Sequence, residues 1–447
     1  MQILLYSTCV CANMAQILRK KDTITVDDMK KEAEREARTM WQFVRTFLKW
    51  LVIAGVTGGI GGLVGSAFHL SVNWAAAFRA AHPWLLPIGG LLIAAIYRLT
   101  KMENKNTNAI IDAIHFGDKV PLLLVPAIYL STVITHLFGG SAGREAAEQH
   151  QDGQNGGSLG CYIGQLFHLD EKDMRIATLC GMSAVFSALF GTPLTATIFA
   201  LEVISVGVFY YSALVPCIVA SLAALAISNA FGIAPTHFTF ALTAVPKLLL
   251  LRVAALAAVC SLMSILFCVT MHGTERLFAG RIQNPWLRIA AGGAIVVVLT
   301  LLVDTGDYNG AGMDVITRAI EGGQAAPDAF FWKLLFTAVT IGSGFKGGEV
   351  VPTFFIGATL GCVLGGLLGI PAGFAAALGL VCVFCGAVNC PIASIVLSIE
   401  LFGAGQLVYF ALACGIAYML SGYFGLYSSQ KILYSKLRTE FINIHAK

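Results

Sequence analysis

Two stretches of the chain decide its fold, because one is a copy of the other. Residues 186–203 read FSALFGTPLTATIFALEV, and residues 384–401 read FCGAVNCPIASIVLSIEL. At an offset of 198 residues, three uncommon positions coincide: Phe186 with Phe384, Pro193 with Pro391, and Glu202 with Glu400. Self-similarity at a fixed offset is the signature of an internal repeat. The chain is therefore predicted to consist of two related halves.

The composition is that of a membrane protein. Of the 447 residues, 57% are hydrophobic and only 12% are charged, with a mean hydropathy of +0.77, whereas soluble proteins carry roughly 25% charged residues. The net charge of +4 is too small and scattered to indicate a nucleic-acid partner. Cys382, Cys385 and Cys390 lie close together, but no histidine joins them to complete a zinc site. We expect no metal and no organic cofactor.

The apolar segments are uneven in length, and glycine or proline interrupts many of them. Several are too short to cross about 30 Å of hydrocarbon, which takes roughly 20 residues. Short, interrupted, paired segments are typical of a transporter core. The predicted division is a cytoplasmic segment with an amphipathic helix (1–42), two transmembrane repeats (43–231 and 232–425), and a cytoplasmic helix that carries Tyr427 (426–447).

Basic residues gather at both ends of the chain. Nine Lys and Arg residues precede residue 50, and the last part of the chain contains Lys431, Lys436, Arg438 and Lys447. The positive-inside rule therefore predicts a multi-pass protein with both termini in the cytoplasm. The first residues lack a basic stretch before the apolar run, so no cleaved signal peptide is expected.

Each half also carries a glycine-rich break that contains a glutamate. Glu145 lies in GGSAGREAAEQ, 48 residues before Pro193, and Glu349 lies in GSGFKGGEVVP, 42 residues before Pro391. We expect the two acids to occupy symmetric positions near the middle of the membrane. An intramembrane carboxylate is costly, so each is a functional-site hypothesis by default.

The breaks suit an anion. A glycine-rich turn that opens a helix presents free backbone N–H groups and the positive end of the helix dipole. A carboxylate placed there competes with the anion when ionised and donates a hydrogen bond when protonated, which couples proton movement to anion movement. The structural alternatives are a buried ion pair of Glu145 with Arg144, and a peripheral pair of Glu349 with Lys346.

These segments resemble the CLC family of anion channels and proton-coupled antiporters. GREAAEQ is similar to the GREGP-type segment of that family, which implies that Glu145 is the gating glutamate. GGEVVP stands in the place of the GxFxP segment, and LYSSQKIL resembles the segment with the anion-coordinating tyrosine, here Tyr427. The resemblance covers about residues 45–440. It implies an all-α polytopic membrane protein, a homodimer whose subunits each contain two inverted repeats of broken and tilted helices.

Three features resemble the bacterial fluoride branch of the family. Glu349 replaces an apolar residue of the chloride members, and Val203 replaces a second glutamate of the chloride antiporters. ENKNTNAIID replaces the segment with the anion-binding serine, so Asn106 is the match, with Thr107 and Asn108 as alternatives. The implied anion-binding residues are Asn106, Ser141, Gly143, Glu349, Val350 and Tyr427, and the implied proton-transfer and gating residues are Glu145 and Glu349.

Two further points concern the acids. After Glu145 the family continues into GGSL through a short run, whereas this chain reads AAEQHQDGQNGGSL. This polar insertion of several residues makes Glu148 an alternative gate. Glu202 and Glu400 are interpreted as structural residues whose carboxylates hydrogen-bond to helix ends.

The predicted function is a proton-coupled fluoride exporter of the bacterial inner (plasma) membrane, which gives fluoride resistance. Fluoride is a strong acceptor to which a carboxylic acid, an asparagine amide or a tyrosine hydroxyl can donate. The alternative is a chloride/proton exchanger or a chloride channel of the same fold. A remote alternative is a membrane-embedded serine hydrolase, because GGSAG fits GxSxG with Ser141 as nucleophile and His136 nearby; otherwise no enzyme is expected.

Overall fold

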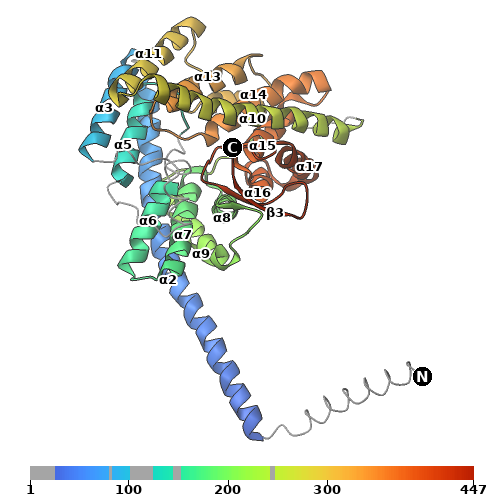
Figure 1. Cartoon of the computed structure of the whole chain (residues 1–447). Helices are drawn as coiled ribbons and strands as arrows, with labels where there is room; N and C mark the ends of the chain where they lie inside the picture. The colour runs from blue at the N-terminus through green and yellow to red at the C-terminus, as the bar shows by residue number, and fades with distance from the viewer. Residues whose placement is uncertain (1–25, 80–82, 101–123, 144–152, 242–246) are drawn as a thin grey trace. The chain divides into compact units, whose positions relative to one another are not determined.

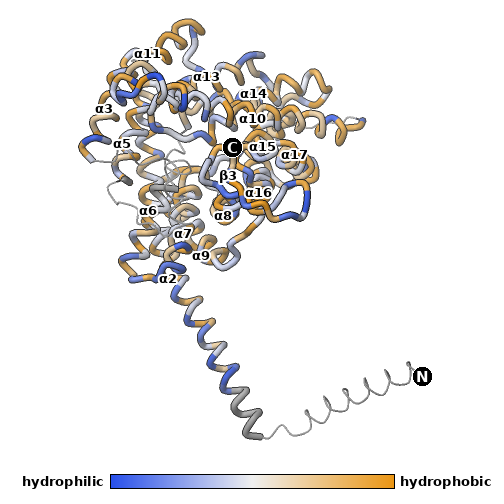
Figure 2. The backbone as a smooth tube through the Cα atoms, viewed as in Figure 1, coloured by the Kyte–Doolittle hydropathy of each residue, from blue (hydrophilic) through white to orange (hydrophobic). Residues whose placement is uncertain are grey.

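The computed structural model describes residues 26–79, 83–100, 124–143, 153–241 and 247–447. Most of these residues are helical (Figure 1), which confirms the predicted all-α class. Six of the described helices are long and apolar enough to cross a membrane, and shorter apolar helices of 10–17 residues accompany them. Apolar residues predominate along most of these helices in Figure 2. The multi-pass prediction is therefore confirmed.

Helices predominate among the described residues, and three short 3-10 helices and three short strands accompany them. The described helices are α2 (Val26–Arg79), α3 (Leu86–Leu99), α5 (Leu124–Leu137), α6 (Gly153–Leu166), α7 (Glu171–Phe190), α8 (Pro193–Glu202), α9 (Leu214–Ala230), α10 (Leu249–Arg281), α11 (Pro285–Val303), α12 (Met313–Glu321), α13 (Ala329–Gly342), α14 (Val350–Leu368), α15 (Ala372–Val388), α16 (Pro391–Phe402) and α17 (Leu407–Leu420). The short 3-10 helices are η1 (Pro83–Leu85), η3 (Tyr211–Ala213) and η4 (Ala404–Gln406), and the strands are β1 (Ser205–Val206), β2 (Lys431–Tyr434) and β3 (Phe441–His445).

Helix α2 runs through the domain boundary that the sequence predicted. It is continuous over 54 residues, so residue 42 lies within a helix and not between two elements. No glycine or proline occurs between Val26 and Ala54, so nothing in the sequence stops the helix there. The chain divides instead into compact units at Met1–Val52 and Ile53–Lys447. Both predicted repeats, from residue 53 onward, lie in the second unit.

Backbone geometry confirms the internal repeat, because α7–α8 and α15–α16 are joined in the same way. Gly191 ends α7 at φ +70°, and Asn389 ends α15 at φ +60°, so both residues are left-handed. The next residues, Thr192 and Cys390, have φ/ψ of −118°/76° and −119°/76°. A proline then opens each following helix. All these pairs keep the offset of 198 residues.

Close helix packing also repeats between the halves. Gly156 of α6 faces Gly181 of α7, and Gly357 of α14 faces Gly379 of α15. A Cβ atom on Gly181 or Gly379 would overlap the carbonyl oxygen of its partner glycine. Small residues at such contacts let two membrane helices approach backbone to backbone. The two helix pairs therefore form equivalent tight cores, one in each half.

The C-terminal segment is a sheet, which corrects the helix predicted for residues 426–447. β1 pairs in parallel with β2, and β2 pairs antiparallel with β3. The strand segments KILY and FINIH are rich in β-branched isoleucine and in aromatic residues, which favour strands. Tyr427 lies in the turn that precedes β2. The sheet fastens this turn to the end of the first half through β1.

We predict that Gly181→Ala and Gly379→Ala lower the stability of the protein. The added methyl group meets a backbone carbonyl that cannot rotate away, and overpacking of this kind costs roughly 1–3 kcal/mol. The measurement is the thermal midpoint and the monodisperse fraction in detergent. The control is Gly273→Ala in α10, where a Cβ meets nothing within 4 Å. Midpoints equal to that of the control would contradict the packing described here.

Candidate functional site

Two acids cap helices of the opposite half. The carboxylate of Glu202, at the end of α8, accepts hydrogen bonds from the N–H groups of Ile392 (3.2 Å) and Ala393 (2.8 Å) at the start of α16. Glu400, near the end of α16, accepts from the second and third residues of α8 at 2.9 and 2.8 Å. Because each helix end meets the other's beginning, α8 and α16 are antiparallel. This supports inverted repeats and the capping predicted for both acids.

The first glycine break is fastened to α13 of the second half. Ser141 is fully buried. Its N–H donates to the hydroxyl oxygen of Thr340 (3.1 Å), and its hydroxyl pairs with that of Thr337 (3.1 Å). The N–H of Gly140 donates to the carbonyl of Thr135 (2.8 Å). The polar groups of the break are thus bonded inside the protein, as broken backbone in a membrane requires.

The two breaks meet at one pair of glycines. The N–H of Gly143 donates to the carbonyl of Gly348 (2.8 Å), and the N–H of Gly348 donates to the carbonyl of Gly143 (3.1 Å). A Cβ atom on Gly347 would overlap that of Ala142, so a side chain does not fit there. The helix breaks of the two halves therefore meet at one place.

Glu349 lies at this junction, at the N-cap position of α14. It is only 4% exposed, and its carbonyl accepts the N–H of Thr353 (3.2 Å), the first turn of the helix. The peripheral position considered from the sequence is therefore wrong. Lys346 instead places its ammonium 4.8 Å from the ring centre of Tyr97. A buried carboxylate at a helix N-terminus is stabilised by the dipole and destabilised by burial.

Lys333 is a buried cation that supports the first glycine break through a neighbouring loop. Lys333 of α13 is fully buried, and its ammonium donates to the carbonyl of Gly310 (2.6 Å). Gly310 in turn donates its N–H to the carbonyl of Gly140 (2.9 Å), and the amide of Asn309 donates to the carbonyl of Gly139 (2.7 Å). Lys333 therefore stabilises the loop that is hydrogen-bonded to the first glycine break. Its positive charge is linked to that break through Gly310.

Tyr427 is buried, with 2% exposure, and both halves hold its turn. The N–H of Gln430 donates to the carbonyl of Tyr427 (3.0 Å). The amide of Gln430 donates to the carbonyls of Val203 (2.8 Å) and Val388 (3.0 Å), at the ends of α8 and α15. One side chain thus satisfies a helix end from each half, which would otherwise need water or a cap.

Lys436 completes this network from the strand connection. Its ammonium donates to the side-chain oxygen of Asn389 (2.5 Å), the carbonyl of Tyr418 (3.0 Å) and the hydroxyl of Ser421 (3.0 Å). Asn389 donates to the amide oxygen of Gln430 (2.9 Å). A cation at the C-terminal ends of α15 and α17 is favourable. Cys268 of α10 lies within electrostatic range of both Glu349 and Lys436.

Several predicted site residues lie outside the described part of the chain: Asn106, Thr107, Asn108, Arg144, Glu145 and Glu148.

The geometry of a hydrolase elbow is missing at Ser141. That elbow needs a strand before the serine, and here helix α5 precedes it. The hydroxyl of Ser141 pairs with Thr337, while the Nδ1 atom of His136 pairs with the carbonyl of Thr132 (2.9 Å).

The cysteines Cys382, Cys385 and Cys390 are buried, and among the described residues no group of three or more His, Cys, Asp or Glu side chains is placed to hold a metal ion.

Fold and site together define a membrane protein of two inverted repeats around converging helix breaks, and known proteins share this plan. Residues 89–422 match the family described as voltage gated chloride channel. A chloride/fluoride channel protein of Pseudomonas syringae pv. tomato is 38% identical over 401 residues, covering 87% of each chain. This chain therefore belongs to the voltage-gated chloride channel (CLC) family.

Two solved structures show the same fold. A CLC-type fluoride/proton antiporter matches with a TM-score of 0.81 and 30% identity, covering 86% of this chain and 98% of that chain. A slow cyanobacterial Cl−/H+ antiporter matches with a TM-score of 0.70 and 21% identity, covering 83% of this chain and 94% of that chain. The second likeness concerns the fold alone.

Three residues of the site were missed from the sequence. Lys333 is a lone charge in an apolar run, which is itself a signal of a buried function. Asn389 stands at the position of Gly191 in the repeat, where a left-handed backbone favours glycine or asparagine. Gln430 has no comparable signal, because its partners are backbone carbonyls that any sequence provides.

We predict that Glu202→Gln and Glu400→Gln both destabilise the protein, the first more strongly because its site is more buried. Each change disturbs two N–H groups, and a buried donor left without a partner costs roughly 1–3 kcal/mol. Thermal unfolding in detergent measures this, with the exposed Glu440→Gln as control. If Glu202→Gln abolished proton coupling at a stability equal to that of Glu400→Gln, a purely structural role for Glu202 would be refuted.

We also predict that Ser141→Ala keeps whatever transport the protein performs to within about threefold. The change removes one neutral hydrogen bond, to Thr337, which contributes about 1 kcal/mol. Ion efflux from liposomes is the measurement, and Thr337→Ala is the matched variant, since it removes the same bond from the other side. Loss of an esterase activity in Ser141→Ala alone would revive the hydrolase hypothesis.

Proposed function

We propose that this chain exports fluoride in exchange for protons. The observation that carries the proposal is Glu349, a buried carboxylate at the N-cap of α14, where the two helix breaks join through Gly143 and Gly348. A carboxyl group there can take up a proton and, when neutral, donate a hydrogen bond. Fluoride gains more from such a donor than chloride does, because it is the smaller and stronger acceptor.

In the proposed mechanism each site residue has a distinct task. Tyr427 and Asn106 hold the anion, together with the first N–H groups of α14, which begin at Val350. Ser141 and Gly143 take part as the frame of the site, since their N–H groups are already bonded to the second half. Glu145 alternates between filling the anion position and carrying a proton. Lys333 favours negative charge at the first break through Gly310 and Gly140.

Substrate choice is supported by residue identity and by relatives. Glu349 stands where chloride members of the family have an apolar residue, and Val203 stands where chloride antiporters have a second glutamate. The relatives named above include a fluoride/proton antiporter and a chloride/fluoride channel protein. Export by proton exchange suits fluoride, since neutral HF enters cells and dissociates inside. In this proposal the protein is a transporter and not an enzyme.

We further propose a homodimer in the plasma membrane of a bacterium, with both termini in the cytoplasm. Apolar side chains are exposed on α9, α16 and α17, among them Val215, Leu222, Ile392 and Val408. Such side chains need lipid or a second copy to cover them. The connection between β2 and β3 carries Lys436 and basic neighbours, which favours the cytoplasmic side.

We predict that Glu349→Gln lowers proton-coupled fluoride efflux at least about tenfold, because glutamine keeps the shape but cannot carry a proton. The measurement is fluoride and chloride efflux from liposomes with proton flux followed in parallel, for the wild type, Glu145→Gln, Glu349→Gln and the exposed control Glu440→Gln. Fluoride should exceed chloride in the wild type. Equal fluxes would favour the chloride exchanger, and unchanged coupling in both acid variants would overturn the mechanism.

A further inference from the structure

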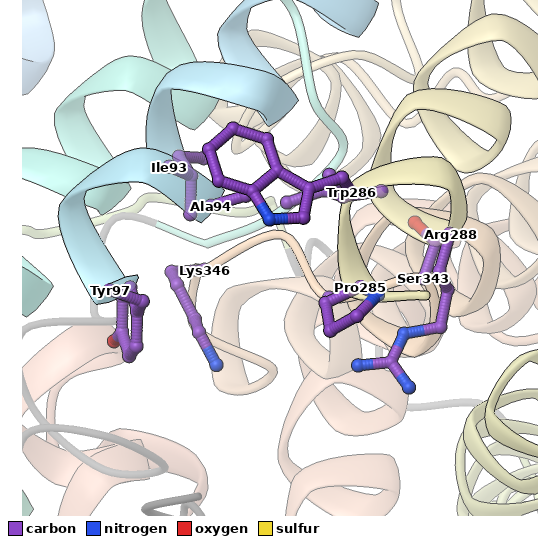
Figure 3. Close-up of a pocket in the computed structure, with 10 residues that line it drawn as sticks. Ile93, Ala94, Tyr97, Pro285, Trp286, Arg288, Ser343 and Lys346 are labelled. Atoms are coloured by element: carbon purple, nitrogen blue, oxygen red, sulfur yellow. The ribbon is translucent and has the colours of Figure 1, made fainter. Parts of the chain in front are cut away.

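A cavity with two cationic side chains lies beside the second helix break. It has a volume of about 100 Å³ and lies between the end of α3, the start of α11 and the segment that joins α13 to α14 (Figure 3). Its walls include Tyr97, Trp286, Arg288 and Lys346, together with apolar side chains. None of the described residues that line it is acidic. The proposed transport site uses neither of the two cations.

The two cations are not neutralised inside the cavity. Lys346 faces the ring of Tyr97, with the ammonium 4.8 Å from its centre. The Nε atom of Arg288 is buried and has no hydrogen-bond partner among the described residues. In Figure 3 the ammonium and the guanidinium point to the same side of the cavity. Lys346 interacts electrostatically with Glu275 and, more weakly, with Arg288. The side chain of Glu275 is exposed and is not part of the lining.

The position of the pair is fixed by packing. Phe345 is buried between α3 and α11, so close that a Cβ on Gly90 would stand 2.9 Å from its ring. Gly344 has φ +112°, a conformation that side chains rarely adopt. These two residues turn the chain so that Lys346 enters the cavity three residues before Glu349. Held in this way, two like charges repel each other, and an anion between them would relieve the repulsion.

The cavity borders the segment that leads to Glu349. Its opposite wall, at Tyr97, belongs to the end of α3. Its wall at Lys346 leads directly to Glu349. The volume is sufficient for a small hydrated inorganic ion, since about 10–15 Å³ of such space already holds one water.

We propose that this cavity is a separate binding site for a small inorganic anion, held by Lys346 and Arg288 before it moves to the site at Glu349. The transfer step rests on the proposed transport function, but the binding does not. Both cations donate charge-assisted hydrogen bonds, which are stronger than neutral ones. The alternative is that Lys346 only packs against the ring of Tyr97, in which case its charge has no effect on anion binding.

Trp286 lines the cavity and provides the probe. Iodide quenching of tryptophan fluorescence should contain a saturable component that Trp286→Phe removes. We expect Lys346→Gln and Arg288→Gln each to weaken that component roughly three- to tenfold, as loss of one charge-assisted contact does. Lys346→Arg should retain it, and the exposed Arg438→Gln is the control. In liposomes the same neutral variants should raise the KM for fluoride and leave the proton-to-anion ratio unchanged.

The outcomes separate this site from the transport function. Quenching at Trp286 that is the same in the wild type, Lys346→Gln and Arg288→Gln overturns the second site, whatever the transport result. Charge-dependent quenching in a protein that carries no fluoride supports the second site and rejects the proposed function. If Lys346→Gln fails to fold, Arg288→Gln and Lys346→Arg still decide the question.

Discussion

The structure depends on one constraint, that a helix which begins inside a membrane must find partners for its first N–H groups. In α8 and α16 the partners are carboxylates from the opposite half, Glu202 and Glu400. Hydrocarbon supplies no water to replace them. These short helices therefore exist only as an antiparallel pair. In each half a second helix pair, α6 with α7 and α14 with α15, packs backbone to backbone through glycines.

The two helix breaks must also satisfy their backbone N–H groups inside the membrane, but they do so with different partners. At the first break the backbone is satisfied by hydroxyls of α13 and by Gly348, so it is held by the second half. The start of α14 instead has Glu349 at its N-cap, without a side-chain hydrogen bond to the helix's first N–H groups. A group that can gain or lose a proton thus stands at a helix end that favours negative charge. That is the chemistry an anion/proton exchanger needs.

The sequence predicted those parts of the fold that have local causes. The repeat was visible because proline and glutamate recur at one offset. Capping by Glu202 could be predicted because the glutamate stands at the end of a short helix. The C-terminal strands were missed, because β2 pairs with β1, more than 200 residues away, and that pairing decides between strand and helix. The supports of the site were missed for a related reason. Lys333 and Gln430 bind backbone carbonyls, so their partners cannot be recognised from the sequence, although the lone charge of Lys333 in an apolar run is itself a signal.

The reciprocal caps have a consequence for the origin of the fold. A single ancestral half, with one such glutamate and one such helix start, could not have joined the two within itself. It would have needed a second copy inserted upside down in the same bilayer. Gene duplication would then have made permanent a partnership that already existed between separate, oppositely oriented chains, and the present molecule keeps the record of that dimer in two hydrogen-bonded carboxylates.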